Sequence, residues 1–245
     1  MLQKMTTNTD AIMQIEPIGT IQTPYDEKFA VPRQPGLADT PATIRFSGDY
    51  NQMDCFRGIE QFSHLWLIFQ FHQAVERGWK PLVRPPRLGG NDKLGVFATR
   101  SSHRPNGLGM SVVALQALES VDGKPMLKVC GTDLVNGTPI IDIKPYIPYA
   151  DAIDNAHGGF AHTPPATELA VNYTPEAQQQ LSQHSEEFRR LVHQVLAQDP
   201  RPAYQKQASS ARIYGVSLQG MNVRWQVVDG QVLVLDLNDR REISS

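Results

Sequence analysis

The chain has 245 residues and a mass of 27.3 kDa, enough for one large domain or for a domain of about 150 residues followed by a smaller one. Apolar residues make up 40%, charged residues 20%, and the formal net charge is -2, which excludes a disordered or strongly basic chain. The longest mainly apolar run, 65–71, is far shorter than the ~20 residues of a membrane span, and no apolar stretch of signal-peptide length begins the chain; we therefore expect a cytoplasmic protein without a membrane anchor.

The first 156 residues have the pattern of a β domain. Residues 1–14 are expected to be a loose lead-in, and Pro24 to Pro41 holds four prolines, which predicts a long irregular loop. No clear helix is predicted before residue 165. Strands are expected at 15–21, 43–46, 65–71, 94–98, 111–118, 126–131 and 139–143. This spacing predicts an antiparallel or mixed β-barrel over residues 15–156.

A second, smaller domain is expected over residues 165–245. The Gly-, His- and Pro-rich stretch 157–168 indicates a linker. Thr174 then fits an N-cap with Pro175 at the first helical position, and apolar residues recur at helical spacing up to Pro200. Strands follow at 213–218, 222–228 and 231–237, the last two joined by Asp229-Gly230, a strong hairpin signal. We expect a small α+β domain with one helix of about six turns against a three-stranded sheet.

Several common catalytic and metal-binding signatures are missing from the sequence. It contains no GxxxxGK[ST], HExxH or GxSxG, and Gly107-Leu108-Gly109 lacks the third glycine of a dinucleotide fingerprint. Cys55 and Cys130 are isolated, and the histidines do not cluster at metal-ligand spacing. The sequence therefore argues against a Rossmann-type enzyme and predicts reduced thiols and no metal.

Polar groups gather instead in loops. Arg100 and Arg104 lie four residues apart in a loop shaped by Pro105 and two glycines, and arginine forks in such a setting suit a carboxylate or phosphate. Arg33 and Gln34 are stiffened by a proline on each side. His72 and Gln73 follow a buried strand, where ligand contacts are common. The alternative for each is an ordinary surface loop or a satisfied structural residue.

The stretch 77–104 is locally basic. Asp92 is its only acidic residue, and Trp79 lies within it. The basic residues are Arg77, Lys80, Arg84, Arg87, Lys93, Arg100 and Arg104. Such a run fits a polyanion partner, and it also fits a solvated face; composition leaves both interpretations open. Asp133 and Asp142 likewise fit a turn as well as a chemical role.

These segments resemble the TsaA-like (TrmO) family. The resemblance rests on LGVFATRSSHRPNGLGMS (94–111), FAVPRQPG (29–36), RGIEQFSHLWLIFQFHQ (57–73), WKPLVRPPRLGGN (79–91), DLVNGTPIIDIKPYIPYAD (133–151) and DPRPAY (199–204). Ser102, Gly107 and Leu108 depart from the family's signature loop without removing a charged group. The resemblance implies a β-barrel that binds S-adenosylmethionine near a homodimer interface, and a tRNA methyltransferase acting in the anticodon loop, on N6 of threonylcarbamoyladenosine at position 37.

The resemblance also implies which residues bind. Those that match the family's cofactor-contact loops are Arg33, Gln34, Pro35, His72, Gln73, Arg100, Leu108, Met110, Thr132, Asp133, Leu134 and Val135. Our candidate tRNA contacts are Arg84, Arg87, Arg104, Lys144 and Tyr146. Methyl transfer depends mainly on positioning, and Asp142 is our candidate for a base that takes the proton from the accepting nitrogen.

Two other functions stay open on the sequence. One is a non-catalytic RNA-binding module, in which the basic run and the polar loops only hold tRNA. The other is a small-molecule methyltransferase whose C-terminal domain serves oligomerisation. Bound methyl donor would exclude the first, and methylation insensitive to ribonuclease would favour the second.

Overall fold

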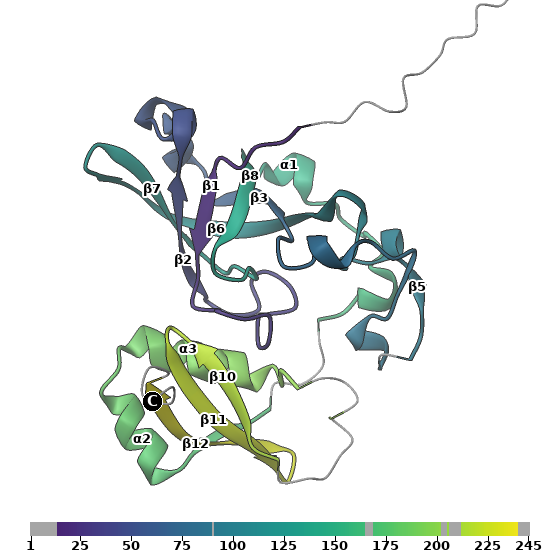
Figure 1. Ribbon diagram of the computed structural model, residues 1–245, viewed down its shortest axis with the longest axis vertical. Helices are drawn as coiled ribbons and strands as arrows, with labels where there is room; N and C mark the ends of the chain where they lie inside the picture. Colours follow the sequence, from purple (N-terminus) through teal and green to yellow (C-terminus); the bar gives the residue numbers. More distant parts are fainter. Residues whose placement is uncertain (1–13, 90, 165–168, 202–204, 206–211, 240–245) are drawn as a thin grey trace, which may run out of the picture.

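A closed antiparallel β-barrel forms the N-terminal part of the computed structural model, which describes residues 14–89, 91–164, 169–201, 205 and 212–239 (Figure 1). Its neighbouring strands run in the order β1-β2-β7-β6-β3-β8. Their bounds are β1 Gly19–Gln22, β2 Pro41–Phe46, β3 His64–Gln70, β6 Leu108–Val121, β7 Lys124–Cys130 and β8 Thr138–Pro145. The predicted barrel is confirmed, whereas the expected lead-in lies, up to residue 13, outside the described residues.

Alternating side chains fill the barrel. In β3, Leu65, Leu67 and Phe69 are buried inside, while Trp66 and Ile68 are only partly covered on the outer face. Each fully buried aliphatic or aromatic side chain contributes roughly 1.5–3 kcal/mol, which makes one strand register strongly preferred. A bulge between Ile68 and Phe69 in the pairing with β8 changes the register once along that strand.

The predicted strand 94–98 is wrong beyond its first two residues. Strand β5 (Leu94–Gly95) pairs only with β4 (Leu82–Val83), and Val96–Ala98 forms a 3₁₀ turn. Val96 is buried but Phe97 is 79% exposed, so this run has no second covered face to hold it in a sheet. The barrel therefore has six strands, and 79–98 belongs to an arm beside it.

Short helical turns complete the N-terminal part. The α-helix α1 (Pro148–Asp151) is an exception to the prediction of no helix before residue 165, although it has only 4 residues. The turn at 159–161 contacts the turn at 86–88, and Arg87 donates to the Thr163 carbonyl, so the end of segment 147–164 lies against segment 79–98. We call these two segments together the arm; α1 at its start lies beside the barrel, near β3 and β8 (Figure 1). The described 3₁₀ turns are Gly48–Tyr50, Met53–Phe56, Ile59–Gln61, Val75–Arg77, Pro86–Leu88, Val96–Ala98, Pro105–Gly107 and Gly159–Ala161.

The C-terminal domain is an α+β unit with two corrections to the prediction. Its sheet has the order β10-β11-β12-β9, with β9 running parallel to β12, so it is four-stranded rather than three-stranded. The expected long helix is two helices, because Ser185 caps a second one: its hydroxyl accepts the Phe188 N–H at 3.2 Å. The elements are β9 Val171–Tyr173, α2 Pro175–Ser182, α3 Glu186–Ala197, β10 Tyr214–Leu218, β11 Met221–Val228 and β12 Gln231–Asp239.

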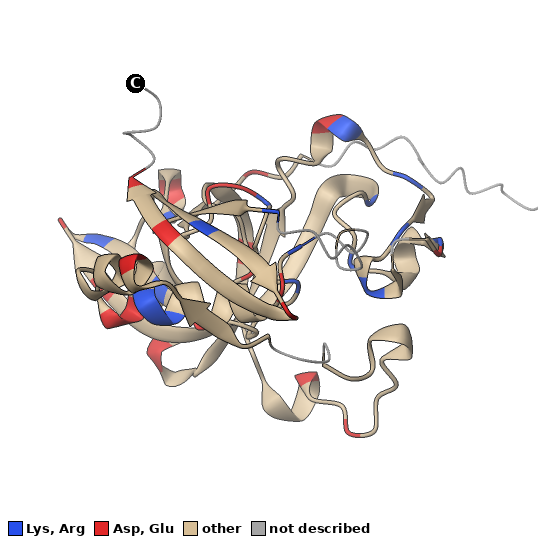
Figure 2. Cartoon of the chain, turned by 90° about the horizontal axis from the view of Figure 1, so that it is seen from below, with Lys and Arg blue, Asp and Glu red and all other residues tan. Residues whose placement is uncertain are grey.

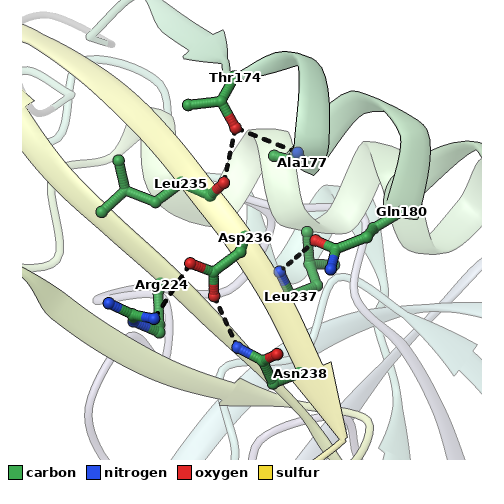
Figure 3. A network of polar contacts seen from close by, with 8 residues as sticks. All are labelled: Thr174, Ala177, Gln180, Arg224, Leu235, Asp236, Leu237 and Asn238. Carbon is green, nitrogen blue, oxygen red and sulfur yellow. Dashed lines mark hydrogen bonds and ion pairs between the residues drawn. The ribbon is translucent and has the colours of Figure 1, made fainter.

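Polar contacts tie α2 to the sheet (Figure 3). The Thr174 hydroxyl accepts the Ala177 N–H at 3.1 Å, as predicted for an N-cap, and donates to the Leu235 carbonyl at 2.6 Å. Gln180 accepts the Leu237 N–H at 2.8 Å through its side-chain carbonyl. These contacts satisfy backbone groups at the helix start and along β12, which fixes α2 against the sheet.

The long loop between β1 and β2 joins the two domains. We call residues 23–40 the bridging segment. Tyr25 and Ala30 from this segment are buried in the C-terminal core with Leu196 and Trp225, while the barrel has a separate core of its own. The proline-rich loop predicted from the sequence is thus ordered between two packed bodies.

Candidate functional site

Four connections meet at one end of the barrel. They are the bridging segment, the residues after β3, the loop before β6, and the loop between β7 and β8. Backbone hydrogen bonds join them: Gly36 N–H donates to the Gly131 carbonyl at 2.8 Å, Asn136 N–H to the Tyr25 carbonyl at 2.8 Å, and Phe71 N–H to the Gly107 carbonyl at 2.7 Å. Most of the predicted cofactor-contact residues therefore lie in one loop cluster.

Arg100 and Gln34 face each other within this cluster. The Arg100 guanidinium donates to the Gln34 side-chain carbonyl at 2.6 Å and remains solvent-exposed. Arg33 is exposed beside it, and the preceding Pro32 is buried, which fixes the backbone that carries both side chains. The pair leaves guanidinium N–H groups available for an anionic group of a ligand.

Asp133 lies in the same cluster as a partly buried carboxylate. Its Oδ1 accepts the hydroxyl of Ser111 at 2.7 Å, and Ser111 itself is 2% exposed. Burial raises the pKa of Asp133; the Ser111 hydrogen bond, a backbone hydrogen bond and the charge of Arg100 oppose that rise. The carboxylate is therefore held where a cation would gain from its charge.

Thr132 next to it is fully buried, and its hydroxyl Oγ1 has no hydrogen-bond partner in the structure. A buried hydroxyl without a partner costs free energy unless something else satisfies it. An exposed guanidinium, a partly buried carboxylate and this hydroxyl together suit a small zwitterionic ligand with its own donors and acceptors. The donor set therefore fits S-adenosylmethionine, which carries a carboxylate, an ammonium and a sulfonium.

Other predicted cofactor contacts take different positions. His72 is half-buried and Gln73 exposed at the end of β3, while Leu108 and Met110 begin β6. Leu134 is 2% exposed and belongs to the barrel core, so its side chain packs, and its carbonyl accepts the Thr23 hydroxyl at 2.9 Å. The carbonyl of Val135 accepts the Thr138 hydroxyl at 2.6 Å. Pro35 is half-buried in the bridging segment.

Arg104 braces its own loop. Its guanidinium donates to the Thr99 carbonyl at 3.1 Å and the Ser101 carbonyl at 3.5 Å. Asn106 and Gly107 follow with φ of 64° and 61°, the left-handed conformation that lets the loop turn into β6. The structure thus gives Arg104 a structural use besides the predicted contact with tRNA.

The basic residues of 77–104 are spread along the arm and the loop after it (Figure 2). Within the described part of the chain none of the seven forms an ion pair. Arg84 is exposed, whereas Arg87 donates to the carbonyl and, at 3.2 Å, to the hydroxyl of Thr163 and so holds the two halves of the arm together. The solvent-facing charge is available to a polyanion.

Asp142 lies outside the loop cluster, in the middle of β8. It pairs with Ile68, which pairs in turn with Met110, so these three residues form one row on the outer face of the barrel. The Asp142 carboxylate accepts the Ile143 N–H at 2.9 Å. The bulge near Ile68 sets this outward orientation of Asp142.

Lys144 and Tyr146 lie still further from the cluster. Lys144 pairs with Trp66, and the Tyr146 N–H donates to the His64 carbonyl at 3.0 Å, at the start of β3. The rings of Trp66 and Tyr146 are 5.9 Å apart. These two predicted tRNA contacts therefore belong to the opposite end of the barrel from Arg100.

Sequence reasoning missed two residues of the cluster, Ser111 and Lys28. Ser111 is the one polar residue among the buried inward positions of β6, a break in alternation that was visible in the sequence. Lys28 donates to the Ser102 hydroxyl at 3.1 Å, and burial and then the nearby Arg77 lower the pKa of its ammonium group. No sequence pattern placed Lys28 beside the signature loop.

Two absences hold for the described residues. No helix among them is long and apolar enough to cross a membrane. They contain no group of three or more His, Cys, Asp or Glu side chains arranged to hold a metal ion.

Comparison with known proteins relates both domains of the chain to one family. The model of the tRNA-methyltransferase O N-terminal domain matches residues 20–152, and that of the TrmO C-terminal domain matches residues 166–240. A tRNA (adenine(37)-N6)-methyltransferase of Escherichia coli K12 is 48% identical over 93% of this chain and 98% of its own length. A putative S-adenosylmethionine-dependent methyltransferase, RcsF, of Pseudomonas aeruginosa is 49% identical over 86% of this chain and 91% of its own.

A solved structure agrees with these relatives. The crystal structure of TrmO from Pseudomonas aeruginosa superimposes with a TM-score of 0.77 at 39% identity, covering 93% of this chain and 99% of the other. The agreement extends over barrel and C-terminal domain together. The chain therefore belongs to the TrmO family, the tRNA-methyltransferase O proteins.

Proposed function

We infer that this chain is an S-adenosylmethionine-dependent tRNA methyltransferase that methylates the exocyclic N6 nitrogen of adenosine 37. The observation that carries this function is the loop cluster at the barrel end, in which Arg100, Gln34 and Asp133 meet beside the unpartnered hydroxyl of Thr132. The cluster supplies both signs of charge in a site shaped by ordered loops.

The donor, when bound, supplies an activated methyl group on a positively charged sulfur. Arg100, oriented by Gln34, recognises a carboxylate. Asp133, held by the Ser111 hydroxyl, offers carboxylate oxygens to a neighbouring cation, and Thr132 completes the set with a hydroxyl. These residues bind and orient, and orientation supplies much of the rate in an in-line displacement. The other predicted donor contacts remain part of this proposal; they are Arg33, Pro35, His72, Gln73, Leu108, Met110, Leu134 and Val135.

In this proposal, the adenine ring of the acceptor nucleotide approaches the donor site from the outer face of the barrel. We assign threonylcarbamoyladenosine of the anticodon loop as the acceptor, supported by the exposed basic residues that begin at Arg77 and end at Arg100. Trp79, 58% exposed, offers a ring face on the arm for stacking on an unpaired base. Asp142, two strands from Met110 on the outer face, stays our candidate for the group that takes the proton.

A homodimer is part of the same proposal. Large apolar side chains stand exposed on the arm, among them Leu82 at 53%, Phe97, Tyr149 at 90% and Ile153 at 74%. Apolar groups gathered on one extension are typical of a surface that a second copy covers. Light scattering of the purified protein should give twice the chain mass, and a monomer would refute this part. Because its substrate is tRNA, we also propose that the protein acts in the cytoplasm.

The decisive experiment combines tRNA analysis with purified protein. Mass spectrometry of tRNA nucleosides should show the methylated form of the modified adenosine only in cells that contain the protein. In vitro, labelled methyl should appear in tRNA and disappear after ribonuclease digestion of the substrate. Binding of tRNA with neither donor binding nor methyl transfer would favour the RNA-binding module, and transfer that survives ribonuclease would favour the small-molecule methyltransferase.

A further inference from the structure

The bridging segment lies between the C-terminal core and the loop cluster, and it carries Arg33 and Gln34 at its tip. Tyr25, 0% exposed, forms a β-bridge with Leu218 of β10 and packs in the C-terminal core. Its hydroxyl lies 2.7 Å from that of Thr40, at the other end of the segment. One buried side chain thus fixes both ends of the loop to the same place.

Polar contacts from helix α3 hold the second half of the segment. The Asp39 N–H donates to the Gln194 side-chain carbonyl at 2.9 Å, and the Gln194 amide donates back to the Asp39 carboxylate at 3.0 Å. The Gln198 amide donates to the Leu37 carbonyl at 2.9 Å. Leu37 is three residues from Gln34, so the C-terminal domain fixes the backbone close to the proposed donor contact.

The backbone between these anchors is strained. Ala30 has φ of 68°, in the left-handed region that a non-glycine residue rarely occupies, and it is 8% exposed within the C-terminal core. Such a conformation persists only where surrounding contacts impose it. Here those contacts come from the C-terminal domain, with Phe29 and Val31 packing against the same core.

The other side of the segment meets the site. Gln34 accepts from Arg100, Lys28 donates to Ser102, and Gly36 donates to the carbonyl of Gly131, two residues before Asp133. A shift of the segment relative to the barrel would therefore change the position of Gln34 and the orientation of Arg100.

We propose that the C-terminal domain sets the affinity for the methyl donor, with Gln194, Gln198 and Tyr25 acting as positioning residues for Gln34 and Arg100 through the bridging segment. This inference rests on the proposed donor site and adds a role for a domain that contributes no residue to it. By linkage, bound donor stabilises the contact between α3 and the segment to the same extent.

The test replaces both glutamines. Alanine is a good helix former, so the double variant Gln194→Ala/Gln198→Ala removes the hydrogen bonds to Leu37 and Asp39 and keeps α3. The ion pair between Arg190 and Asp39, 3.6 Å long, stays in place. The matched control is Gln178→Ala/Gln179→Ala, two exposed positions on α2, which packs on β12 and β9. Calorimetric titration measures the dissociation constant for S-adenosylmethionine, and methyl-transfer kinetics separate donor KM from kcat.

The double variant should raise the donor dissociation constant and KM at least fivefold, with kcat at saturating donor within twofold of wild type; the control should match wild type. Hydrogen exchange in α3 should slow on donor binding in wild type but not in the double variant. Wild-type affinity in the double variant would overturn the inference alone. A wild-type protein that binds no donor would overturn the proposed function as well.

A second variant guards against a folding defect. Tyr25→Phe keeps the ring in the C-terminal core and removes only the hydrogen bond to Thr40. It should weaken donor binding in the same direction, while thermal unfolding followed by circular dichroism should show that the protein is still fully folded at the assay temperature. An unchanged dissociation constant in this variant would contradict the role of Tyr25.

Discussion

Ser111→Ala tests whether the charge of Asp133 binds the donor. The substitution removes one hydrogen bond, 2.7 Å long, from a buried hydroxyl to the Asp133 carboxylate. Hydrogen bonds to charged groups contribute about 1.5–3 kcal/mol, and 1.36 kcal/mol corresponds to one pKa unit. Because this bond favours the ionised form, its loss should raise the pKa of Asp133 further above its ordinary value.

The sign of the pH dependence follows from that rise. Donor affinity should increase as pH rises through the pKa of Asp133, and in Ser111→Ala the midpoint of this transition should move to higher pH. Asp133→Asn serves as the control and should show no such transition. Calorimetric titration across the pH range measures it. Equal midpoints in wild type and Ser111→Ala would refute the role given to the Ser111–Asp133 pair.

The same pair predicts a trend in stability without donor. The folded pKa of Asp133 is raised above the unfolded value of 3.8, so the protonated carboxyl stabilises the fold at low pH. That contribution is fully present below 3.8 and is lost as pH rises through the folded pKa. In Ser111→Ala the loss should continue to higher pH, which urea unfolding at a series of pH values would detect.

Four further substitutions give distinct outcomes. Arg100→Ala should weaken donor binding by ~1.5–3 kcal/mol with little change in thermal stability, and calorimetry with wild-type affinity would contradict it. Arg84→Ala should reduce the slope of log affinity for tRNA against log salt concentration by about one or less, without changing donor affinity. A slope equal to that of wild type would show that Arg84 is an ordinary solvated residue that does not contact phosphate. Asp142→Asn should lower the single-turnover rate roughly a hundredfold if Asp142 is the base, whereas a near-normal rate would show that the proton leaves to water. Gly109→Ala would place a Cβ 2.8 Å from the Phe71 ring and still nearer that of Phe69, so it should destabilise by about 1–3 kcal/mol, seen as a lower melting temperature.

Strands whose alternation is set by a buried face were predictable from the sequence. The run at 65–71 and the hairpin around Asp229-Gly230, where φ is 50° and 75°, follow from local pattern and turn chemistry. The predictions failed where tertiary context decides. The apolar run 94–98 does not continue as a strand, because nothing packs over Phe97. The apolar residues continue at helical spacing past Ser185, but Ser185 caps a new helix there and divides the predicted helix in two.

The sequence predicted which loops form the candidate site, but it did not predict which side chains in them bond to one another. Proline and arginine marked Arg33 and Arg100 as special positions, because such residues have few structural uses in a loop. The pairing of Ser111 with Asp133 depends on the register of the barrel strands that separate them by 22 positions, which no local pattern specifies. The outward orientation of Asp142 depends on one bulge, which is also invisible in the sequence.

The bridging segment could not be ordered by its polar contacts alone. Fixing the backbone of one residue costs about 1–2 kcal/mol, whereas a net hydrogen bond returns about 0.5–1.5 kcal/mol, so a loop with roughly one contact per residue stays unfavourable. Apolar burial must make up the difference, and in this segment it comes from Tyr25 and Ala30 in the core of the other domain. Because pre-ordered loops bind with less entropic cost, the packing of Tyr25 becomes part of the affinity of a site to which its side chain does not belong.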